Sequence, residues 1–167
     1  MFIKKKSTSE YANVFWGNSK VDTPQSIGMA CNWNWLKAQT GNTHPGSQIP
    51  YGWVTCLPYS GAYTSGYGVN ACSFSGPGPE VFKRKYAWGV THFHTSGTGY
   101  LKYFYNYFLE SAYTENSDIN TFSKLDNEFA QPGYYSGYLS DYKVKIELTC
   151  NTFAAFHKYT FVGRAHV

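Results

Sequence analysis

The segment Lys143-Val144-Lys145-Ile146-Glu147-Leu148-Thr149 alternates charged or polar side chains with branched apolar ones. Successive side chains of a β-strand point to opposite faces, so Val144, Ile146 and Leu148 share one face and the polar residues share the other. This pattern predicts a strand that is buried on one side and solvated on the other, and it decides how the neighbouring sequence folds.

Two further predicted strands flank this segment. Pro132-Gly133 opens a strand over residues 134–139, and residues 140–142 turn the chain before residue 143. Asn151-Thr152 suggests a second turn, followed by a strand over residues 153–162. One face of that strand carries Phe153, Ala155, His157, Tyr159 and Phe161. Three consecutive antiparallel strands form a meander, whose apolar face is buried only if another sheet covers it.

Shorter elements are expected earlier in the chain. Residues 51–57 predict a strand that Pro58 stops, and residues 86–95 predict a second one. One face of the second strand carries Trp88, Val90, His92 and His94. An aromatic run predicts a strand within residues 102–112, whereas residues 114–127 are polar and loop-like. Residues 32–38 are expected to form a short helix.

Composition favours an all-β domain. Of the 167 residues, 20% are aromatic and only 14% are charged, and the glycines and prolines follow no period. Tyr, Phe, Trp, Val and Thr favour strands, while Gly and Pro favour the turns between them. The length suits one domain. We therefore predict an antiparallel β-sandwich with few short helices.

The charge pattern argues against nucleic acid as a partner. Net charge is +4, and apart from Lys4-Lys5-Lys6 and Lys83-Arg84-Lys85 the basic residues are dispersed. Because no basic stripe or nucleic-acid motif accompanies the aromatics, both triplets are interpreted as solvated surface. No segment approaches the roughly 20 apolar residues that cross a bilayer, so no membrane partner is expected.

The N-terminus and the cysteines bear on the compartment. No apolar segment follows Lys4-Lys5-Lys6, so the start of the chain is not a signal peptide. This favours a cytoplasmic protein or one trimmed of its leader. The four cysteines lack CxxC spacing, so no zinc site is expected, and four free thiols are a simpler expectation than disulfides.

Two glycine-rich segments have the composition of a sugar site. One runs from Gly41-Asn42-Thr43-His44-Pro45-Gly46 to Tyr51-Gly52, and the other is residues 89–99, with two histidines followed by Ser96-Gly97-Thr98-Gly99. Glycine lets the backbone approach a ligand closely, hydroxyl and amide groups bind sugar hydroxyls, and an aromatic face covers the apolar side of the ring. Candidate stacking platforms are Trp33, Trp35, Trp53 and Trp88.

Other interpretations of the second segment stay open. His92 and His94 leave the same face of the predicted strand, which suits a metal, but no third ligand is identifiable by spacing. Both are also compatible with ordinary strand positions. Ser96-Gly97-Thr98-Gly99 lacks the G-x-G-x-x-G and GK[ST] patterns of phosphate loops, so no nucleotide site is expected.

Catalytic groups are not recognisable in the sequence. No Gly-x-Ser-x-Gly elbow supplies a nucleophile. Glycoside hydrolysis needs two carboxylates in one cleft, roughly 5–9.5 Å apart depending on stereochemistry. Most of the ten carboxylates occupy expected loops or outward strand positions, and Glu128 and Glu147 are interpreted as acids paired in the core. We therefore assign no catalytic residue to this chain.

Several motifs in order carry a resemblance to a known family. After the two glycine-rich segments come Pro132-Gly133-Tyr134-Tyr135-Ser136, Glu147-Leu148-Thr149 and Phe156-His157-Lys158-Tyr159-Thr160-Phe161. The set spans roughly residues 40–162 and resembles the N-terminal domain of glycoside hydrolase family 92, the α-mannosidases. The family strings read approximately GNTxPGAxxPFGM, GFSHxHxSGTG, PGYYSV, AELT and GFHRYTFP.

The resemblance implies a two-domain enzyme. Its N-terminal part is a β-sandwich similar to that of galactose mutarotase, and its C-terminal part is an (α/α)6 barrel. Members are calcium-dependent, exo-acting enzymes that invert the anomeric carbon of α-mannose, and the catalytic carboxylates and calcium ligands belong to the barrel. Residues 1–39 would then be a lead-in and residues 40–167 part of the sandwich, with no metal or cofactor in this chain.

The resemblance also implies which residues face the sugar. They are His92, His94, Ser96, Gly97, Thr98 and Gly99, with His44 and Trp53 behind them. The implied ligand is a mannose-type glycan, and the implied partner is the catalytic barrel. Residues 100–107 depart from the Cys and Gly-Asp-rich run usual in the family, which bears on sugar specificity.

Three functions are compatible with the sequence. The first is the N-terminal domain of an α-mannosidase-like glycosidase, inert alone, which completes a substrate cleft and packs on a barrel absent from the chain. The second is a free-standing carbohydrate-binding module. The third is an interaction protein whose exposed aromatic face docks a separate barrel subunit. Because the meander ends five residues before Val167, we expect the chain to be part of a longer protein with more of the sandwich.

Overall fold

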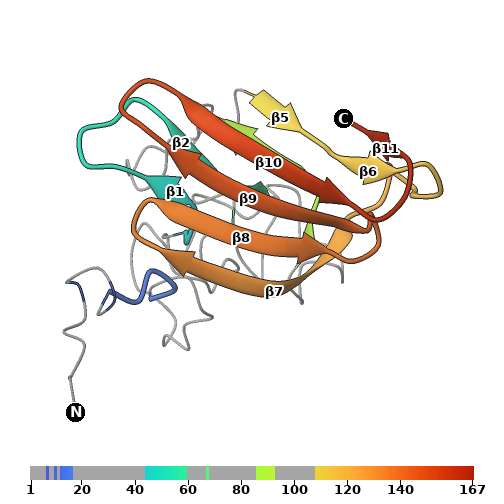
Figure 1. Cartoon of the computed structure of the whole chain (residues 1–167), viewed down its shortest axis with the longest axis horizontal. Coiled ribbons are helices and arrows are strands. Elements are labelled where there is room, and N and C mark those ends of the chain that lie inside the picture. The colour runs from blue at the N-terminus through green and yellow to red at the C-terminus, as the bar shows by residue number, and fades with distance from the viewer. Residues whose placement is uncertain are drawn as a thin grey trace, which may run out of the picture.

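The computed structural model describes residues 44–59, 86–92 and 108–167, together with residues 7, 10, 12–16 and 67. The regular elements in this part of the chain are strands (Figure 1). They are β1 (Ser47–Gln48), β2 (Thr55–Tyr59), β3 (Tyr86–Ala87), β4 (Gly89–His92), β5 (Phe108–Glu110), β6 (Tyr113–Thr114), β7 (Ser123–Gln131), β8 (Tyr134–Leu139), β9 (Val144–Cys150), β10 (Ala155–Phe161) and β11 (Ala165–His166). The helix expected over residues 32–38 lies outside the described residues.

The strands form two larger antiparallel sheets and one small ribbon. The first sheet has the order β1-β2-β4-β5, the second has the order β10-β9-β8-β7-β3, and β11 pairs with β6. In Figure 1 the strands β7 to β10 lie in front of β1 and β2. The predicted all-β antiparallel sandwich is confirmed. Among the described residues, no helix has the length and apolar character that spanning a bilayer requires.

The meander β8-β9-β10 is the part of the fold that the sequence predicts best. β8 has the predicted bounds, β9 begins one residue later than predicted, and β10 is shorter than residues 153–162. Val144, Ile146 and Leu148 are fully buried, whereas their neighbours along β9 are partly or wholly exposed. The alternation of apolar and polar residues therefore produces the half-buried strand that it predicts.

The sheet β1-β2-β4-β5 supplies the cover that the meander needs. Cys56 and Leu57 on β2 and Val90 on β4 pack in one cluster with residues of the second sheet. The second sheet and its turns contribute Leu125, Tyr135, Leu139, Tyr142, Val144, Ile146 and Leu148. Cys56 and Cys150 are free thiols, and Cys31 and Cys72 lie outside the described residues.

Pro58 does not stop the strand before it, which corrects the prediction for residues 51–57. β2 begins at Thr55 and continues through Pro58 to Tyr59. Proline lacks the N–H that a central strand donates. β1 pairs with β2 only at Thr55 and Cys56, so at Pro58 one side of β2 has no paired strand among the described residues. The missing donor is therefore tolerated.

Residues 86–92 form two strands in different sheets, not the one strand predicted over residues 86–95. β3 pairs with β7 of the second sheet, and β4 pairs with β2 and β5 of the first. The change occurs at Trp88, whose N–H donates to Tyr59 O at 2.8 Å and whose carbonyl accepts from Ser111 Oγ at 2.6 Å. Residues 93–95 lie outside the described part.

Two more predictions change near the middle of the chain. The strand expected within residues 102–112 is represented by β5, and residues 102–107 lie outside the described residues. The prediction of a loop over residues 114–127 is wrong at its end, because β7 begins at Ser123. A register shift between Asp126 and Phe129, with Asn127 at a φ of 52°, inserts an extra residue into β7. This bulge breaks the alternation that would have revealed the strand.

Candidate functional site

Three connections meet at one end of the sandwich, which we call the loop end. They are residues 49–54 between β1 and β2, Pro132-Gly133 between β7 and β8, and residues 151–154 between β9 and β10, all on the left in Figure 1. Ser47 Oγ donates to Gly133 O at 2.8 Å, and Trp53 N–H donates to Thr152 O at 2.8 Å. These two bonds join loops of both sheets into one surface.

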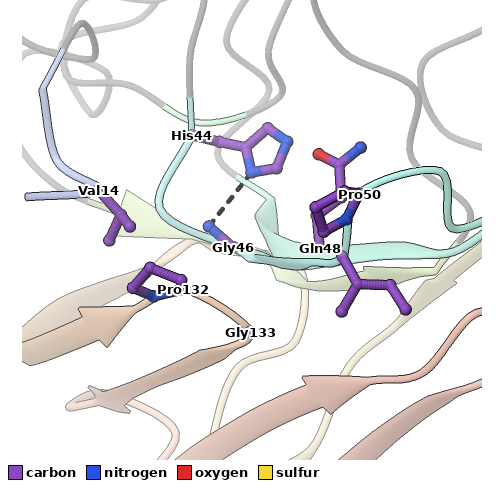
Figure 2. A pocket seen from close by; sticks show the side chains of 8 residues that line it. Val14, His44, Gly46, Gln48, Pro50, Pro132 and Gly133 are labelled. Carbon is purple, nitrogen blue, oxygen red and sulfur yellow. Dashed lines mark hydrogen bonds between the residues drawn. The ribbon is translucent and has the colours of Figure 1, made fainter. Parts of the chain in front are cut away.

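A pocket of about 380 Å³ opens at the loop end (Figure 2). Its lining consists of Val14, His44, Gly46, Gln48, Ile49, Pro50, Pro132 and Gly133. One wall is therefore the first glycine-rich segment, and the facing wall is the hairpin turn of the second sheet. The pocket spans the gap between the two sheets, so its shape depends on how the sheets are held together.

His44 enters this pocket as a neutral hydrogen-bond donor. Its Nδ1 accepts the N–H of Gly46 at 3.2 Å (Figure 2), so a neutral ring carries its proton on Nε2. Burial lowers the pKa of His44 from 6.5 to about 4, because a charged imidazole is poorly solvated there. Near neutral pH the ring therefore carries no charge.

Gly46 lets β1 approach β2 closely beneath His44. A Cβ at this position would meet the carbonyl oxygen of Cys56, would lie 2.5 Å from Leu57 Cβ, and would lie 3.0 Å from His44 Nδ1. The glycine of this motif is therefore needed for strand packing as well as for the pocket.

Replacing Gly46 with alanine is expected to destabilise the fold by about 1–3 kcal/mol, because backbone atoms must move to admit the methyl group. Urea unfolding followed by tryptophan fluorescence measures the change. An unchanged unfolding midpoint would show that β1 shifts freely and does not fix the pocket.

The loop end displays aromatic side chains to solvent. Tyr51 is 99% exposed and Trp53 is 78% exposed. Tyr51 follows Pro50 in a turn closed by Gly52 N–H to Ile49 O at 3.0 Å, and its φ of 59° is a conformation that favours glycine or asparagine. A bulky aromatic held there against its backbone preference points to a role at the surface. Tyr51 was not among the candidate site residues, because residues 51–57 were predicted to be a strand; the turn at Pro50-Tyr51-Gly52 replaces the start of that strand.

His92 does not line the pocket. It ends β4, is half-buried, and its ring lies 5.4 Å from the ring of His157 and 6.4 Å from that of Phe108. Thr91 pairs with Leu57, so His92 lies beside Cys56, and β4 runs toward the loop end. The structure thus brings His44 and Trp53 to one surface and places His92 between the sheets. The remaining predicted wall residues, His94, Ser96, Gly97, Thr98 and Gly99, lie outside the described residues.

The two acids singled out by the sequence are held in contacts within the fold. Glu128 Oε1 accepts from Tyr67 OH at 2.5 Å and from Tyr135 OH at 2.9 Å. Glu147 accepts from Tyr134 OH at 2.8 Å and lies 3.1 Å from Lys158 Nζ. The Tyr134 hydrogen bond, followed by those of its lysine neighbours, lowers the pKa of Glu147 to about 2.

Carboxylates are the groups that hydrolysis would require at the pocket. None of the described residues that line it carries one. Within the described ranges, no three His, Cys, Asp or Glu side chains gather closely enough to hold a metal ion. We therefore assign no metal ligand and no catalytic pair to the described residues.

Comparison with known proteins gives a consistent result. A family model described as the glycosyl hydrolase family 92 N-terminal domain matches residues 11–166. A solved family GH92 α-mannosidase from Bacteroides thetaiotaomicron shares 23% identity and a TM-score of 0.65, covering 96% of this chain and 19% of that chain. Its complex with mannoimidazole shares 22% identity and a TM-score of 0.60, covering 92% and 18%. The chain thus spans about a fifth of these solved proteins. No curated protein matches the sequence.

Proposed function

The chain belongs to the glycosyl hydrolase family 92 N-terminal domain family, and from this membership we propose that it is the N-terminal β-sandwich of an α-mannosidase-like glycosidase, whose loop end forms one wall of the substrate cleft. The observation that carries the proposal is the pocket at the loop end, with its neutral His44 and the exposed rings of Tyr51 and Trp53 nearby. The ligand is a mannose-type glycan.

The chemistry of these side chains suits an uncharged polyol. The His44 Nε2–H can donate to a sugar hydroxyl, and the Gln48 amide, on the same pocket wall, can donate and accept. An exposed indole or phenol ring covers the apolar face of a pyranose. His94, Ser96, Gly97, Thr98 and Gly99 belong to the same proposed wall, with Trp53 behind them. His92 lies between the sheets at the end of β4, so in this proposal it supports the wall and does not face the sugar.

The catalytic groups come from a second domain in this proposal. Protonation of the leaving group and activation of water need two carboxylates facing the scissile bond, and the pocket lining has none. The chain would pack on a calcium-dependent (α/α)6 barrel that supplies them. Its own contribution to the reaction would be to bind the glycan and to exclude water from one side of the cleft.

The proposal predicts sugar binding without turnover by the chain alone. Titration calorimetry with mannobiose should give binding in the millimolar range, and His44→Ala or Trp53→Ala should weaken it about tenfold, the loss of one good contact. Phe129→Ala is the matched control, because Phe129 is also an exposed aromatic but lies on β7 away from the pocket lining. Hydrolysis of an aryl α-mannoside by the chain with calcium, or loss of binding in the control alone, would contradict it.

A free-standing carbohydrate-binding module is the second candidate, favoured by a pocket that this chain forms by itself. The two functions differ in whether the rest of a longer polypeptide increases the affinity for the sugar. A module binds mannobiose equally well alone or attached, whereas half of a cleft gains affinity when the catalytic domain is present. Calorimetry on both forms separates the two.

A further inference from the structure

Side chains of both sheets meet in a polar cluster at the edge opposite β1. His92 comes from β4 and Glu110 from β5 of the first sheet, and His157 and Tyr159 come from β10 of the second. β5 and β10 are each the last strand of their sheet. We call these four residues the histidine seam, because they join the two layers where no backbone hydrogen bonds between sheets are possible.

His157 is the centre of the seam. Its Nδ1 lies 3.6 Å from Glu110 Oε2 and 3.3 Å from Tyr159 OH, and its ring centroid lies 5.4 Å from that of His92 at an angle of 57°. The side chain is only 8% exposed. Its Nε2 is buried and has no hydrogen-bond partner among the described residues. The surroundings therefore satisfy one nitrogen of the ring but not the other.

This arrangement suits a neutral imidazole. A carboxylate only accepts hydrogen bonds, so the proton belongs on Nδ1 toward Glu110, and Nε2 is a bare acceptor. Protonation would place a second N–H in a site without an acceptor, close to another imidazole. Burial accordingly lowers the pKa of His157, Glu110 opposes that shift, and His92 adds to it.

The hydroxyl of Tyr159 and the thiol of Cys56, both near the seam, keep their protons. Burial, followed by the charge of Glu110, raises the pKa of Tyr159, so its hydroxyl remains a donor. Cys56 on β2, whose charge would add to that effect, has its own pKa raised to about 12, chiefly by burial. Neither of these two groups therefore changes charge as the pH falls below neutral, whereas His157 does.

We propose that Glu110 and His157 are positioning residues for the pocket: through His92 they hold the first sheet against the second while the His157 imidazole is neutral, and acid loosens that hold. The path from seam to pocket runs across the first sheet. His92 lies beside Cys56, Cys56 pairs with Ser47, and Ser47 Oγ donates to Gly133 in the pocket wall. This inference rests on the proposed sugar site, because the pocket spans the two sheets that the seam joins.

The sign of the pH effect follows from the lowered pKa of His157. A histidine whose pKa in the folded state lies below its ordinary 6.5 stabilises that state most when neutral. The contribution is complete above about pH 6.5 and is lost as the pH falls through the folded-state value. Sugar affinity should fall over the same interval. By linkage, saturating sugar should lower the titration midpoint of His157.

The test combines an NMR titration of the His157 imidazole with calorimetry of mannobiose across the same pH range. Glu110→Gln removes the charge that favours protonated His157, so its titration midpoint and the midpoint of the affinity profile should both move to lower pH. His157→Gln should flatten the part of the profile that follows this midpoint, an affinity change of about fivefold or more. His44 is unchanged in both variants, so its own titration contributes equally to every profile.

His166→Gln is the control, because this exposed histidine on β11 lies outside the seam, and it should leave the profile of the native chain unchanged. If His157→Gln does not fold, the two midpoints measured in Glu110→Gln still test the proposal. Movement of the His157 midpoint in Glu110→Gln with an unmoved affinity profile would overturn the role of the seam and leave the sugar site standing. No binding at any pH would overturn both.

Discussion

Replacing Ile146 with alanine is expected to lower the free energy of unfolding by about 3 kcal/mol, close to the whole margin of some small domains. Ile146 is fully buried on β9, where its backbone neighbours are Gly137 on β8 and Tyr159 on β10. Removal of its branched side chain loses the transfer free energy of three carbon atoms and leaves a cavity between the sheets. Packed neighbours on both sides limit how far the site can collapse.

Urea unfolding of both chains at neutral pH measures the effect. Thr160→Ala is the matched control, because Thr160 lies on the next strand opposite Lys145 and is exposed. That change should stay within about 0.5 kcal/mol, as exposed substitutions usually do. Equal losses in the two variants would mean that β9 is not the centre of the core.

Acidification is expected to destabilise the chain through His44 by up to about 3 kcal/mol. The pKa of His44 falls from 6.5 to about 4 on folding, and each unit corresponds to about 1.4 kcal/mol. Because the folded-state pKa is the lower one, this stability is complete above about pH 6.5 and is lost as the pH falls toward about 4. A protonated His44 Nδ1 also can no longer accept the Gly46 N–H. Stability measured by urea titration at successive pH values reports the loss.

His44→Asn isolates the contribution of this residue. The Asn Oδ1 can take the place of Nδ1 as the acceptor for Gly46 but does not titrate. The variant should therefore lose less stability than the native chain between about pH 6.5 and pH 4. An identical pH dependence in the two chains would show that His44 is solvated and that the pocket does not hold it neutral.

Much of the fold could be predicted from the sequence where alternation is unbroken. The sequence predicts β9 because Val144, Ile146 and Leu148 recur at every second position, and the turn residues on either side then predict β8 and β10. The sequence does not predict β7, because the bulge beyond Asp126 changes which residues face inward. The sequence also does not predict that residues 86–92 contribute strands to two different sheets. Pairing partners are set by tertiary contacts, which the pattern of a single strand does not contain.

The candidate site was predictable in composition but not in arrangement. His44 lines the pocket and Trp53 is exposed in the connection that follows β1, whereas their contact with a sugar stays a prediction. The contact between His92 and His157 joins residues far apart in the chain, and spacing carries no signal of it. The one available clue was the inward position of His157 on an otherwise apolar strand face.

Residues 86–92 give the sandwich a covalent tie between its layers. A force that slides one sheet across the other must rotate the backbone at Trp88 and rupture its bonds to Tyr59 and Ser111, at 2.8 and 2.6 Å. By contrast, β1 is joined to β2 over the pairs Ser47–Cys56 and Gln48–Thr55. β3 is joined to β7 over equally few pairs, so under mechanical tension both short pairings should rupture early, while the backbone at Trp88 still connects the two layers.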